Sequence, residues 1–271
     1  MQYEIKTIKT PELQMRYFRF GKDGARPLVI IPGLSTSSVM GSAGSVRLRY
    51  APLAEEFDIY VFDRRLDMPQ VYTVRDMARD TAVAMDALGI EGAFLFGVSQ
   101  GGMIAQVIAA KRPELAGAMA LASTSSRISD KTAETVGEWV SLAERRERTA
   151  LMKAFGRDVY SPAVYAMYRE VLLASAAAIS DEDLDRFIVQ AKGTEGFDIR
   201  SELKNVKCPA LVIAAGEDRV LGTEYSLETA GILGCGSFVY EGAGHGVYDE
   251  APDYPERLLG FFKGPGTYTG E

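Results

Sequence analysis

Short apolar runs recur along the chain and alternate with longer stretches in which apolar residues follow helical spacing. The runs predict strands at 28–31, 59–62, 93–96, 118–121, 210–214 and 237–240. The longer stretches predict helices at 74–88, 103–111, 222–233 and 252–262. Parallel strands need crossover connections, which helices usually provide. The alternation therefore predicts an α/β fold whose mostly parallel central sheet is flanked by helices on both faces.

The two ends of the chain have patterns of their own. Segments 3–8 and 13–20 alternate polar and apolar residues, which predicts an antiparallel hairpin at one edge of the sheet. Segment 264–271 contains three glycines and no apolar periodicity, and we expect it to form a flexible tail.

Segment 127–202 interrupts the alternation, because it contains no strand pattern. It is helical in character at 134–155, 165–178 and 181–192. Ser180 is a plausible N-cap for the last of these, with Asp183 completing an approximate capping box. We therefore predict a helical cap at 127–202, inserted into a core made of residues 1–126 and 203–271. Such a cap would lie over the carboxyl edge of the sheet, where ligands bind in open α/β folds.

The most informative stretch joins the strand predicted at 93–96 to the helix that follows it. It reads Gly97-Val98-Ser99-Gln100-Gly101, which has the form G-x-S-x-G. This turn reverses the chain within a few residues and leaves the serine in a strained conformation at its tip. Side chains at positions 97 and 101 would collide with the neighbouring strand or helix, so both are glycine. The turn presents the Ser99 hydroxyl at the start of a helix, which makes Ser99 the candidate nucleophile.

A serine hydroxyl needs a general base, and the sequence contains a single histidine, His245. It lies among glycines directly after the last predicted strand, where a loop can reach the serine. The acid that orients the histidine is expected between the two in the chain, after another strand. Glu217 and Asp218 both qualify, and the G-x-x-D spacing favours Asp218, with Glu217 as a solvated neighbour. Ser99, His245 and Asp218 are therefore predicted to form a catalytic triad.

Acyl transfer also needs two backbone N–H groups aimed at the developing negative charge. Gln100, at the start of the helix that follows the nucleophile, is expected to supply one. Leu34, which follows Pro32-Gly33 after the strand at 28–31, is the candidate for the other. We interpret residues 35–38 as a polar connecting loop, in which Ser35 is the residue that could also serve the site.

Together these residues resemble the α/β-hydrolase superfamily, and the likeness extends from about residue 16 to residue 262. The resemblance implies an α/β-hydrolase fold in which segment 127–202 is the cap that shapes the substrate pocket. It also implies catalysis without a cofactor or a metal site. Segments 97–106 and 120–127 are similar to bacterial enol-lactonases and carboxylesterases. A serine at position 99 excludes the branches with an aspartate nucleophile, the haloalkane dehalogenases and the epoxide hydrolases.

Two positions depart from the family pattern. The family often has a histidine before the glycine of the oxyanion loop, where this chain has Pro32. The loop after the strand at 59–62 usually reads D-x-R-G-x-G, whereas here Asp63-Arg64-Arg65-Leu66-Asp67-Met68 contains no glycine. Arg64, Arg65 and Asp67 either line the pocket or flank it. The departures bear on the substrate rather than on the triad.

We expect a hydrolase that cleaves a carboxylic ester or lactone of a small to medium, apolar substrate through an acyl-enzyme on Ser99. Large side chains of the cap either form its core or line the pocket: Met152, Phe155, Tyr160, Tyr165, Met167 and Tyr168. Alternatives that keep the triad are a C–C bond hydrolase and a cofactor-free perhydrolase. An alternative from another class is a ligand-binding receptor with a slow triad.

Composition and charge exclude several other classes of protein. The 271 residues are 47% hydrophobic and 25% charged, which is ordinary for a globular protein. A net charge of −7 argues against a nucleic-acid partner. We see no signal-peptide pattern and no run of the roughly 20 apolar residues that a membrane span needs. We therefore expect a cytoplasmic monomer or homodimer whose partner is a small-molecule substrate. Cys208 and Cys235 lack metal-ligand spacing and are expected to be reduced thiols.

Overall fold

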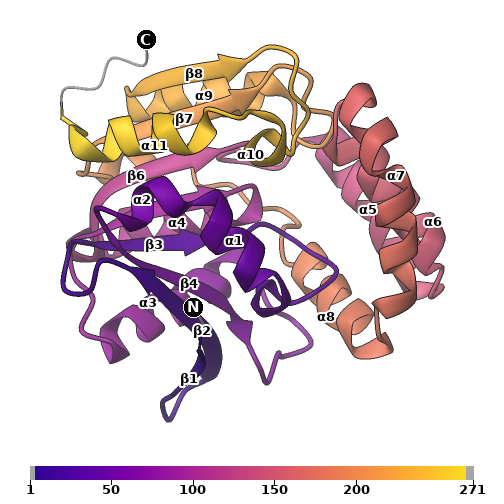
Figure 1. Ribbon diagram of the computed structural model, residues 1–271, viewed down its shortest axis with the longest axis horizontal. Coiled ribbons are helices and arrows are strands. Elements are labelled where there is room, and N and C mark those ends of the chain that lie inside the picture. Colours follow the sequence, from indigo (N-terminus) through magenta and orange to yellow (C-terminus); the bar gives the residue numbers. More distant parts are fainter. Residues whose placement is uncertain (1–3, 267–271) are drawn as a thin grey trace.

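A sheet of eight strands forms the centre of the computed structural model, which describes residues 4–266 (Figure 1). The strands are β1 Ile5–Lys9, β2 Gln14–Gly21, β3 Pro27–Ile31, β4 Asp58–Arg65, β5 Ala93–Val98, β6 Ala116–Ala122, β7 Ala210–Ala215 and β8 Gly236–Tyr240. Their order across the sheet is β1-β2-β4-β3-β5-β6-β7-β8. β2 pairs antiparallel with both β1 and β4, and all the other neighbouring strands pair in parallel. The prediction of a mostly parallel sheet is confirmed.

The first two strands form the predicted antiparallel hairpin at the edge of this sheet. Ile5 pairs with Phe18, and Lys9 pairs with Gln14 next to the turn. Residue 3, with which the predicted hairpin began, lies outside the described residues, as do residues 267–271 of the predicted tail.

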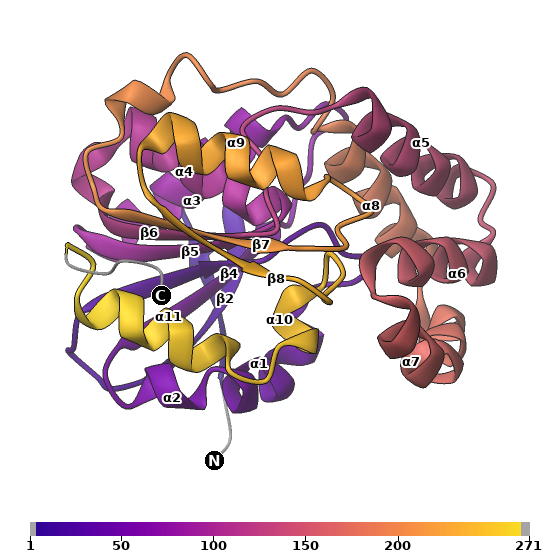
Figure 2. The same cartoon turned by 90° about the horizontal axis from the view of Figure 1, so that it is seen from above.

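Helices cover both faces of the sheet, as predicted (Figure 2). One face carries α3 Val74–Ala87, α4 Gln100–Lys111 and α9 Thr223–Leu233, and the other carries α1 Ala43–Arg49, α2 Ala51–Ala54, α10 Val247–Glu250 and α11 Tyr254–Lys263. In β3, Val29 and Ile31 belong to the apolar cluster on one face, and Leu28 and Ile30 belong to the cluster on the other. Because successive side chains of a strand point to opposite faces, a strand covered on both sides needs an unbroken apolar run.

Residues 127–202, named the cap segment below, connect β6 to β7. They include α5 Asp130–Glu144, α6 Arg148–Val159, α7 Pro162–Ser175 and α8 Asp181–Lys192, which lie together beyond one end of the sheet (Figure 1). An isolated antiparallel bridge between Arg127 and Asp198 brings the two ends of the cap segment together. The capping box predicted at the start of α8 is present, since the Ser180 hydroxyl accepts from the Asp183 N–H at 3.1 Å. The division of the chain into core and cap at these boundaries stays a prediction.

Several elements differ from their predicted bounds. β4 continues past the apolar run to Arg65, because Arg65 still pairs with Met15 of β2 although its side chain is polar. α4 begins at Gln100 instead of Met103, because the turn at Ser99 leads directly into the helix. The helical stretch predicted at 134–155 is divided between α5 and α6 by a turn at Arg146, whose φ is +58°. Among the described residues, no helix is both long and apolar enough to cross a membrane.

Candidate active site

Ser99 lies at the turn between β5 and α4. Its φ is 51° and its ψ is −122°, a backbone conformation that residues with a side chain rarely adopt. The Ser99 N–H donates to the carbonyl of Ala122 at 2.9 Å. The Ser99 carbonyl accepts from the Gly102 N–H at 2.8 Å and from the Thr124 hydroxyl at 2.7 Å. β6 and the residues after it therefore hold the serine in a strained conformation that the turn alone would relax.

Glycines make this sharp turn sterically possible. A Cβ atom on Gly101 would lie 1.9 Å from the carbonyl oxygen of Ile31 in the neighbouring strand. A Cβ atom on Gly97 would lie 2.5 Å from the carbonyl oxygen of Gly101. The collisions that the sequence predicts at these two positions are thus present, and no larger residue fits without moving β3 or α4.

His245 comes from the loop that follows β8, and its side chain is buried next to Ser99. Its Nε2 lies 2.9 Å from the Ser99 Oγ, and its Nδ1 lies 2.8 Å from the Asp218 Oδ2. Both contacts are at hydrogen-bond distance, and together they form an unbroken chain from carboxylate to imidazole to hydroxyl. The structure therefore brings together the three side chains that the sequence selects from three different strand ends.

Asp218 follows β7 and is 5% exposed. Its Oδ1 accepts the backbone N–H groups of Val220 at 2.9 Å and Leu221 at 2.8 Å, which leaves Oδ2 for the histidine. Burial by itself raises the pKa of Asp218, but the charge and hydrogen bond of His245 and the two backbone donors together hold that pKa below its ordinary value. Glu217, the alternative acid, is exposed, so Asp218 is the carboxylate that reaches the imidazole.

The loop that carries His245 is attached to the cap segment. The Gly246 N–H donates to the carbonyl of Val159 at 2.7 Å. A Cβ atom on Gly244 would lie 2.5 Å from the backbone nitrogen of Ser161, so the two backbones pass each other closely. Glu250 bridges them, because its carboxylate accepts both the Ser161 N–H at 2.7 Å and the Gly244 N–H at 3.2 Å. Sequence analysis did not identify this attachment, and the only signal for it was the pair of glycines that flank the histidine.

Leu34 and Gln100, the candidate oxyanion donors, line the same cavity as Ser99 and His245. Gln100 is the first residue of α4, so its N–H has no carbonyl four residues earlier within the helix to bond. Gly33 comes close to Ser99, since a Cβ atom on Gly33 would lie 3.2 Å from the Ser99 Cβ. The loop that carries Leu34 therefore passes directly beside the serine.

Arg64 bonds the side chain of Gln100 and the loop that carries Leu34, the two oxyanion candidates. It is 3% exposed, and its Nη2 donates to the carbonyl of Pro32 at 2.8 Å and to the side-chain oxygen of Gln100 at 3.4 Å. The side-chain nitrogen of Gln100 in turn donates to the carbonyl of Gln190 in α8 at 2.7 Å. From the sequence, Arg64 was expected either to line the pocket or to flank it; in the structure it does not line the cavity beside Ser99. The two-residue period of the strand could have predicted its burial, because Arg64 lies on the same face of β4 as the buried Phe62.

The cavity beside Ser99 has a volume of about 520 Å³, part of it open to solvent, and is named the catalytic cavity below. Its walls come from the oxyanion loop, α4, the cap segment and the loops after β7 and β8. Most lining side chains are apolar: Leu34, Met103, Ile128, Val136, Trp139, Phe155, Val159, Val220, Leu221 and Tyr248. Thr132 and Thr194 add hydroxyl groups. The cavity therefore suits a substrate with a hydrocarbon portion.

Of the large cap residues that the sequence singled out, Phe155 lines the catalytic cavity. Met167 and Tyr168 are instead exposed on α7, and Met152 is buried. Trp139 was not selected from the sequence, but it also lines the cavity. Its ring contacts that of Phe155 in a tilted arrangement, and its Nε1 donates to the Asp158 carboxylate at 3.0 Å. Helical spacing places Trp139 in the cap, but it does not show which way the helix faces.

Residues 4–266 contain no cluster of three or more His, Cys, Asp or Glu side chains that could hold a metal ion. Cys208 and Cys235 are both free and half-buried. Burial raises the pKa of each thiol to about 11, so neither is activated as a nucleophile.

Comparison with known proteins places this geometry among hydrolases. A protein of Pseudomonas savastanoi pv. phaseolicola (strain 1448A / Race 6), named "Putative carbamate hydrolase RutD", is 24% identical over 255 residues, which cover 87% of this chain and 93% of that protein. The solved structure of MGS-M2, an alpha/beta hydrolase enzyme from a deep-sea metagenome library of the Medee basin, superposes with a TM-score of 0.85 at 22% identity, over 95% of this chain and 97% of the other.

The enol-lactonase of Burkholderia xenovorans LB400 superposes with a TM-score of 0.83 at 19% identity, over 95% of this chain and all of the other. At this level of identity the likeness shows the fold. The model of the alpha/beta hydrolase family matches residues 28–257, a range that runs from β3 into α11 and contains Ser99, Asp218 and His245. The protein therefore belongs to the alpha/beta hydrolase family.

Proposed function

We propose that this protein is a serine hydrolase that cleaves a carboxylic ester or lactone of a small to medium substrate through an acyl-enzyme on Ser99. The observation that carries the proposal is the chain of contacts from Asp218 to His245 (2.8 Å) to Ser99 (2.9 Å), at the wall of a mostly apolar cavity. Nucleophile and base at hydrogen-bond distance, with the base oriented by a third group, are the arrangement that activates a serine.

In the proposed reaction, Ser99 Oγ attacks the substrate carbonyl while His245 Nε2 takes the hydroxyl proton. The ionised Asp218 keeps the Nδ1 proton in place and stabilises the imidazolium that forms. The N–H groups of Leu34 and Gln100 donate to the oxyanion. His245 then protonates the leaving alkoxide, and the alcohol departs. A water molecule, activated by the same imidazole, attacks the acyl-enzyme and releases the acid, which restores the Ser99 hydroxyl.

The mostly apolar lining of the catalytic cavity supports an apolar acyl or alcohol group. Burial of apolar surface contributes roughly 25 cal/mol per Å², or about 0.8 kcal/mol per methylene. We therefore expect kcat/KM to rise by about 2- to 4-fold for each methylene added to the acyl chain, until the chain fills the cavity that Trp139 and Phe155 help to line.

Carbamate hydrolysis is a second candidate, favoured by the name of the relative that is 24% identical. The same serine attack on a carbamate carbonyl would pass through a similar tetrahedral intermediate. The hydroxyl oxygens of Thr132 and Thr194 are acceptors for a carbamate N–H, but the other lining side chains are mostly apolar and favour a hydrocarbon group. The ester is therefore our first choice.

The test combines covalent labelling by a fluorophosphonate probe with turnover of p-nitrophenyl esters of increasing acyl length and of a p-nitrophenyl carbamate matched in size. Ser99→Ala is compared with Ser201→Ala, which replaces an exposed serine that lines neither of the cavities described in this article. We expect labelling and ester turnover to vanish in Ser99→Ala and to persist in Ser201→Ala. Faster turnover of the carbamate than of every ester would favour the second candidate. No labelling of folded wild-type protein would exclude an activated serine.

A further inference from the structure

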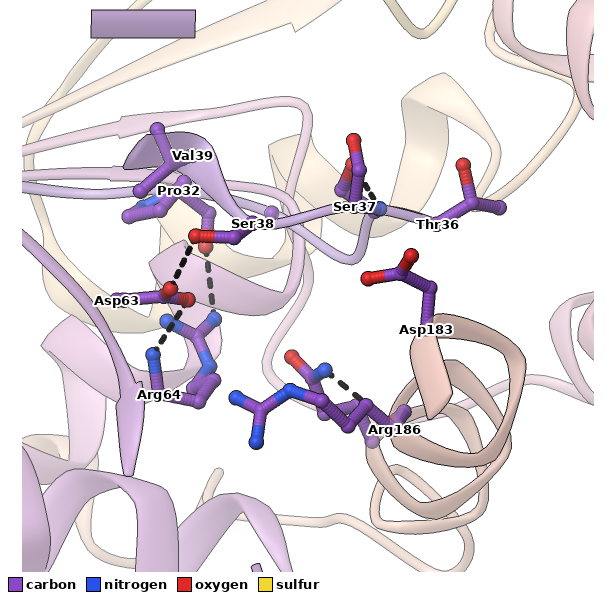
Figure 3. A pocket seen from close by; sticks show the side chains of 12 residues that line it. Pro32, Thr36, Ser37, Ser38, Val39, Asp63, Arg64, Asp183 and Arg186 are labelled. Atoms are coloured by element: carbon purple, nitrogen blue, oxygen red, sulfur yellow. Dashed lines mark hydrogen bonds between the residues drawn. The ribbon is translucent and has the colours of Figure 1, made fainter. Parts of the chain in front are cut away.

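A second cavity adjoins the catalytic cavity at Gly33, which lines both. It has a volume of about 410 Å³, part of it open to solvent, and lies between residues 32–39, the end of β4 and α8 (Figure 3). Unlike the catalytic cavity, it is lined mainly by polar side chains, with Arg64 from β4 and Arg186 from α8 extending toward the same space. We name it the arginine hollow.

Neither guanidinium forms an ion pair with a carboxylate in the described part of the chain. Arg64 donates to the Pro32 carbonyl and the Gln100 side chain, while its buried Nε has no hydrogen-bond partner. Arg186 donates only to main-chain carbonyls, those of Leu66 at 3.0 Å and Arg65 at 3.1 Å. A buried guanidinium without a counter-charge costs free energy unless a ligand supplies that charge.

Two carboxylates also line the hollow, and both already accept hydrogen bonds from other groups. Asp63 accepts the hydroxyl of Ser38 and the N–H of Arg64, at 2.5 and 2.8 Å, and Arg16 lies 3.7 Å from it. Asp183 accepts the N–H and hydroxyl of Ser180, the N-cap of α8, at 3.0 and 2.6 Å, as the N3 residue of the capping box. Neither carboxylate forms a salt bridge with either guanidinium, and the hydrogen bonds of both guanidiniums go to neutral oxygens.

The two cations are also close enough to affect each other. Burial lowers the pKa of Arg64, the charges of Tyr72 and Asp63 act in the opposite direction, and the charge of Arg186 lowers the pKa again. Two guanidiniums that extend toward one cavity, neither of them in a salt bridge with the carboxylates that line it, offer donors that an anion can use. Arginine binds planar carboxylates with two parallel hydrogen bonds, so a carboxylate fits such a pair well.

We propose that the arginine hollow binds a carboxylate group of the substrate, so that the enzyme hydrolyses monoesters of dicarboxylic acids. This assignment of substrate class rests on the proposed function. The apolar part of the substrate would lie in the catalytic cavity, and its carboxylate would extend past Gly33 to Arg64 and Arg186. The serine hydroxyls of residues 35 and 37, which line the hollow, add neutral donors.

The first test compares p-nitrophenyl butyrate with p-nitrophenyl hydrogen glutarate, two esters that differ chiefly by a terminal carboxylate. We expect Arg186→Gln to lower kcat/KM for the glutarate ester at least 10-fold more than for the butyrate. Arg186→Lys, which keeps the charge, should recover part of this selectivity. Arg169→Gln, which replaces an exposed arginine of α7, is the matched control and should change the ratio of the two constants less than 2-fold. An equal effect of Arg186→Gln on both esters would overturn the proposal.

The second test does not depend on turnover. Calorimetry measures glutarate binding to Ser99→Ala and to the same protein with Arg186→Gln added, after circular dichroism has shown that both are folded. We expect the added substitution to weaken glutarate binding at least 10-fold. Binding that is unaffected, or absent from both proteins, contradicts a carboxylate site. If glutarate binds as expected but neither ester is hydrolysed, the site stands and the proposed hydrolase function fails.

Discussion

The catalytic cavity and the arginine hollow share one residue, Gly33, and differ in almost everything else. The first is walled mostly by hydrocarbon from the cap segment and the strand ends. The second is walled by hydroxyls, carboxylates and two guanidiniums. Ser99, with the imidazole that faces it, belongs only to the first. The comparison teaches that the short loop after β3 lies between a polar and a mostly apolar environment, and that Gly33 of this loop lines both.

A residue that lines the hollow, Arg64, holds this loop by a hydrogen bond. The Pro32 carbonyl accepts from Arg64, so the peptide that precedes Gly33 is oriented by a residue that lines the hollow and not the catalytic cavity. A change in the hollow can therefore move the loop and, through it, the wall of the catalytic cavity. A residue of the hollow can alter the rate of the reaction, whereas a residue of the catalytic cavity should not alter anion binding. The predictions below test this asymmetry.

The largest effect is expected for His245→Gln, which removes the base and the link to Asp218. We predict that kcat falls by about 10⁴-fold or more, and equally for the neutral and the carboxylate ester. Glutarate binding, measured by calorimetry on the same variant, should be unchanged. A loss of activity confined to one of the two esters would show that the histidine acts in substrate selection. It would contradict the assignment of catalysis and anion binding to separate cavities.

Arg64→Met is predicted to have the next largest effect, because Arg64 serves both cavities. Loss of its bonds to Pro32 and Gln100 should loosen the oxyanion loop and lower kcat for the neutral ester by about 10- to 100-fold, with little change in KM. The same variant should lose glutarate binding. Arg64→Lys should restore part of kcat. A change in KM alone would mean that Arg64 does not position the loop.

Trp139→Phe should affect only the catalytic cavity. It removes the hydrogen bond to Asp158 from the wall and leaves that carboxylate with one fewer buried donor, so we expect unfolding in urea to show a loss of about 1–3 kcal/mol. Steady-state kinetics with esters of increasing length should show the chain-length optimum displaced toward longer acyl groups. Tyr168→Phe, on the exposed side of α7, is the control and should leave both quantities unchanged. An unaltered optimum in Trp139→Phe would contradict its place in the wall.

The smallest effect concerns Glu202, which lines neither cavity. Hydrogen bonds from Arg75 and Lys111 lower its pKa from 4.5 to about 2 in the folded protein. The folded state therefore binds fewer protons than the unfolded state between these values, so the stabilisation is complete above pH 4.5 and is lost as the pH falls toward 2. Because the group is partly solvated, Glu202→Gln should cost about 1 kcal/mol at pH 7 and flatten the acid limb of urea stability curves. Curves that stay parallel from pH 5 to pH 2.5 would contradict this.

The periodicity of the chain was sufficient to predict the sheet, its covering helices and the helical character of the segment between β6 and β7. Those features depend on local burial patterns, which repeat every two or 3.6 residues. The glycines around Ser99 and the spacing of Asp218 and His245 also follow from local geometry, because each position lies just after a strand. This is why three residues far apart in the chain could be chosen together from the sequence.

Contacts between distant polar groups could not be predicted in the same way. The bond from Arg64 to Pro32 and the bond from Gln100 to Gln190 join segments 32 and 90 residues apart. A hydrophobic pattern specifies which side of an element is buried, but not which carbonyl a buried donor will meet. Trp139 illustrates the same limit. Its helix was expected from the sequence, but the sequence did not show that its side chain lines the same cavity as Ser99.

The hydrogen bond from Gly246 to Val159 has a consequence for protein engineering. The cap segment supplies part of the lining of the catalytic cavity, which makes it an attractive unit to exchange between related hydrolases. Here the backbone next to the imidazole is hydrogen-bonded to the end of α6, so the cap segment cannot be exchanged without regard to this contact. A chimaera that keeps this protein's core has to retain its own backbone course at residues 159–161. A graft that changes the backbone at residues 159–161 would remove the hydrogen bond to Gly246 and displace His245.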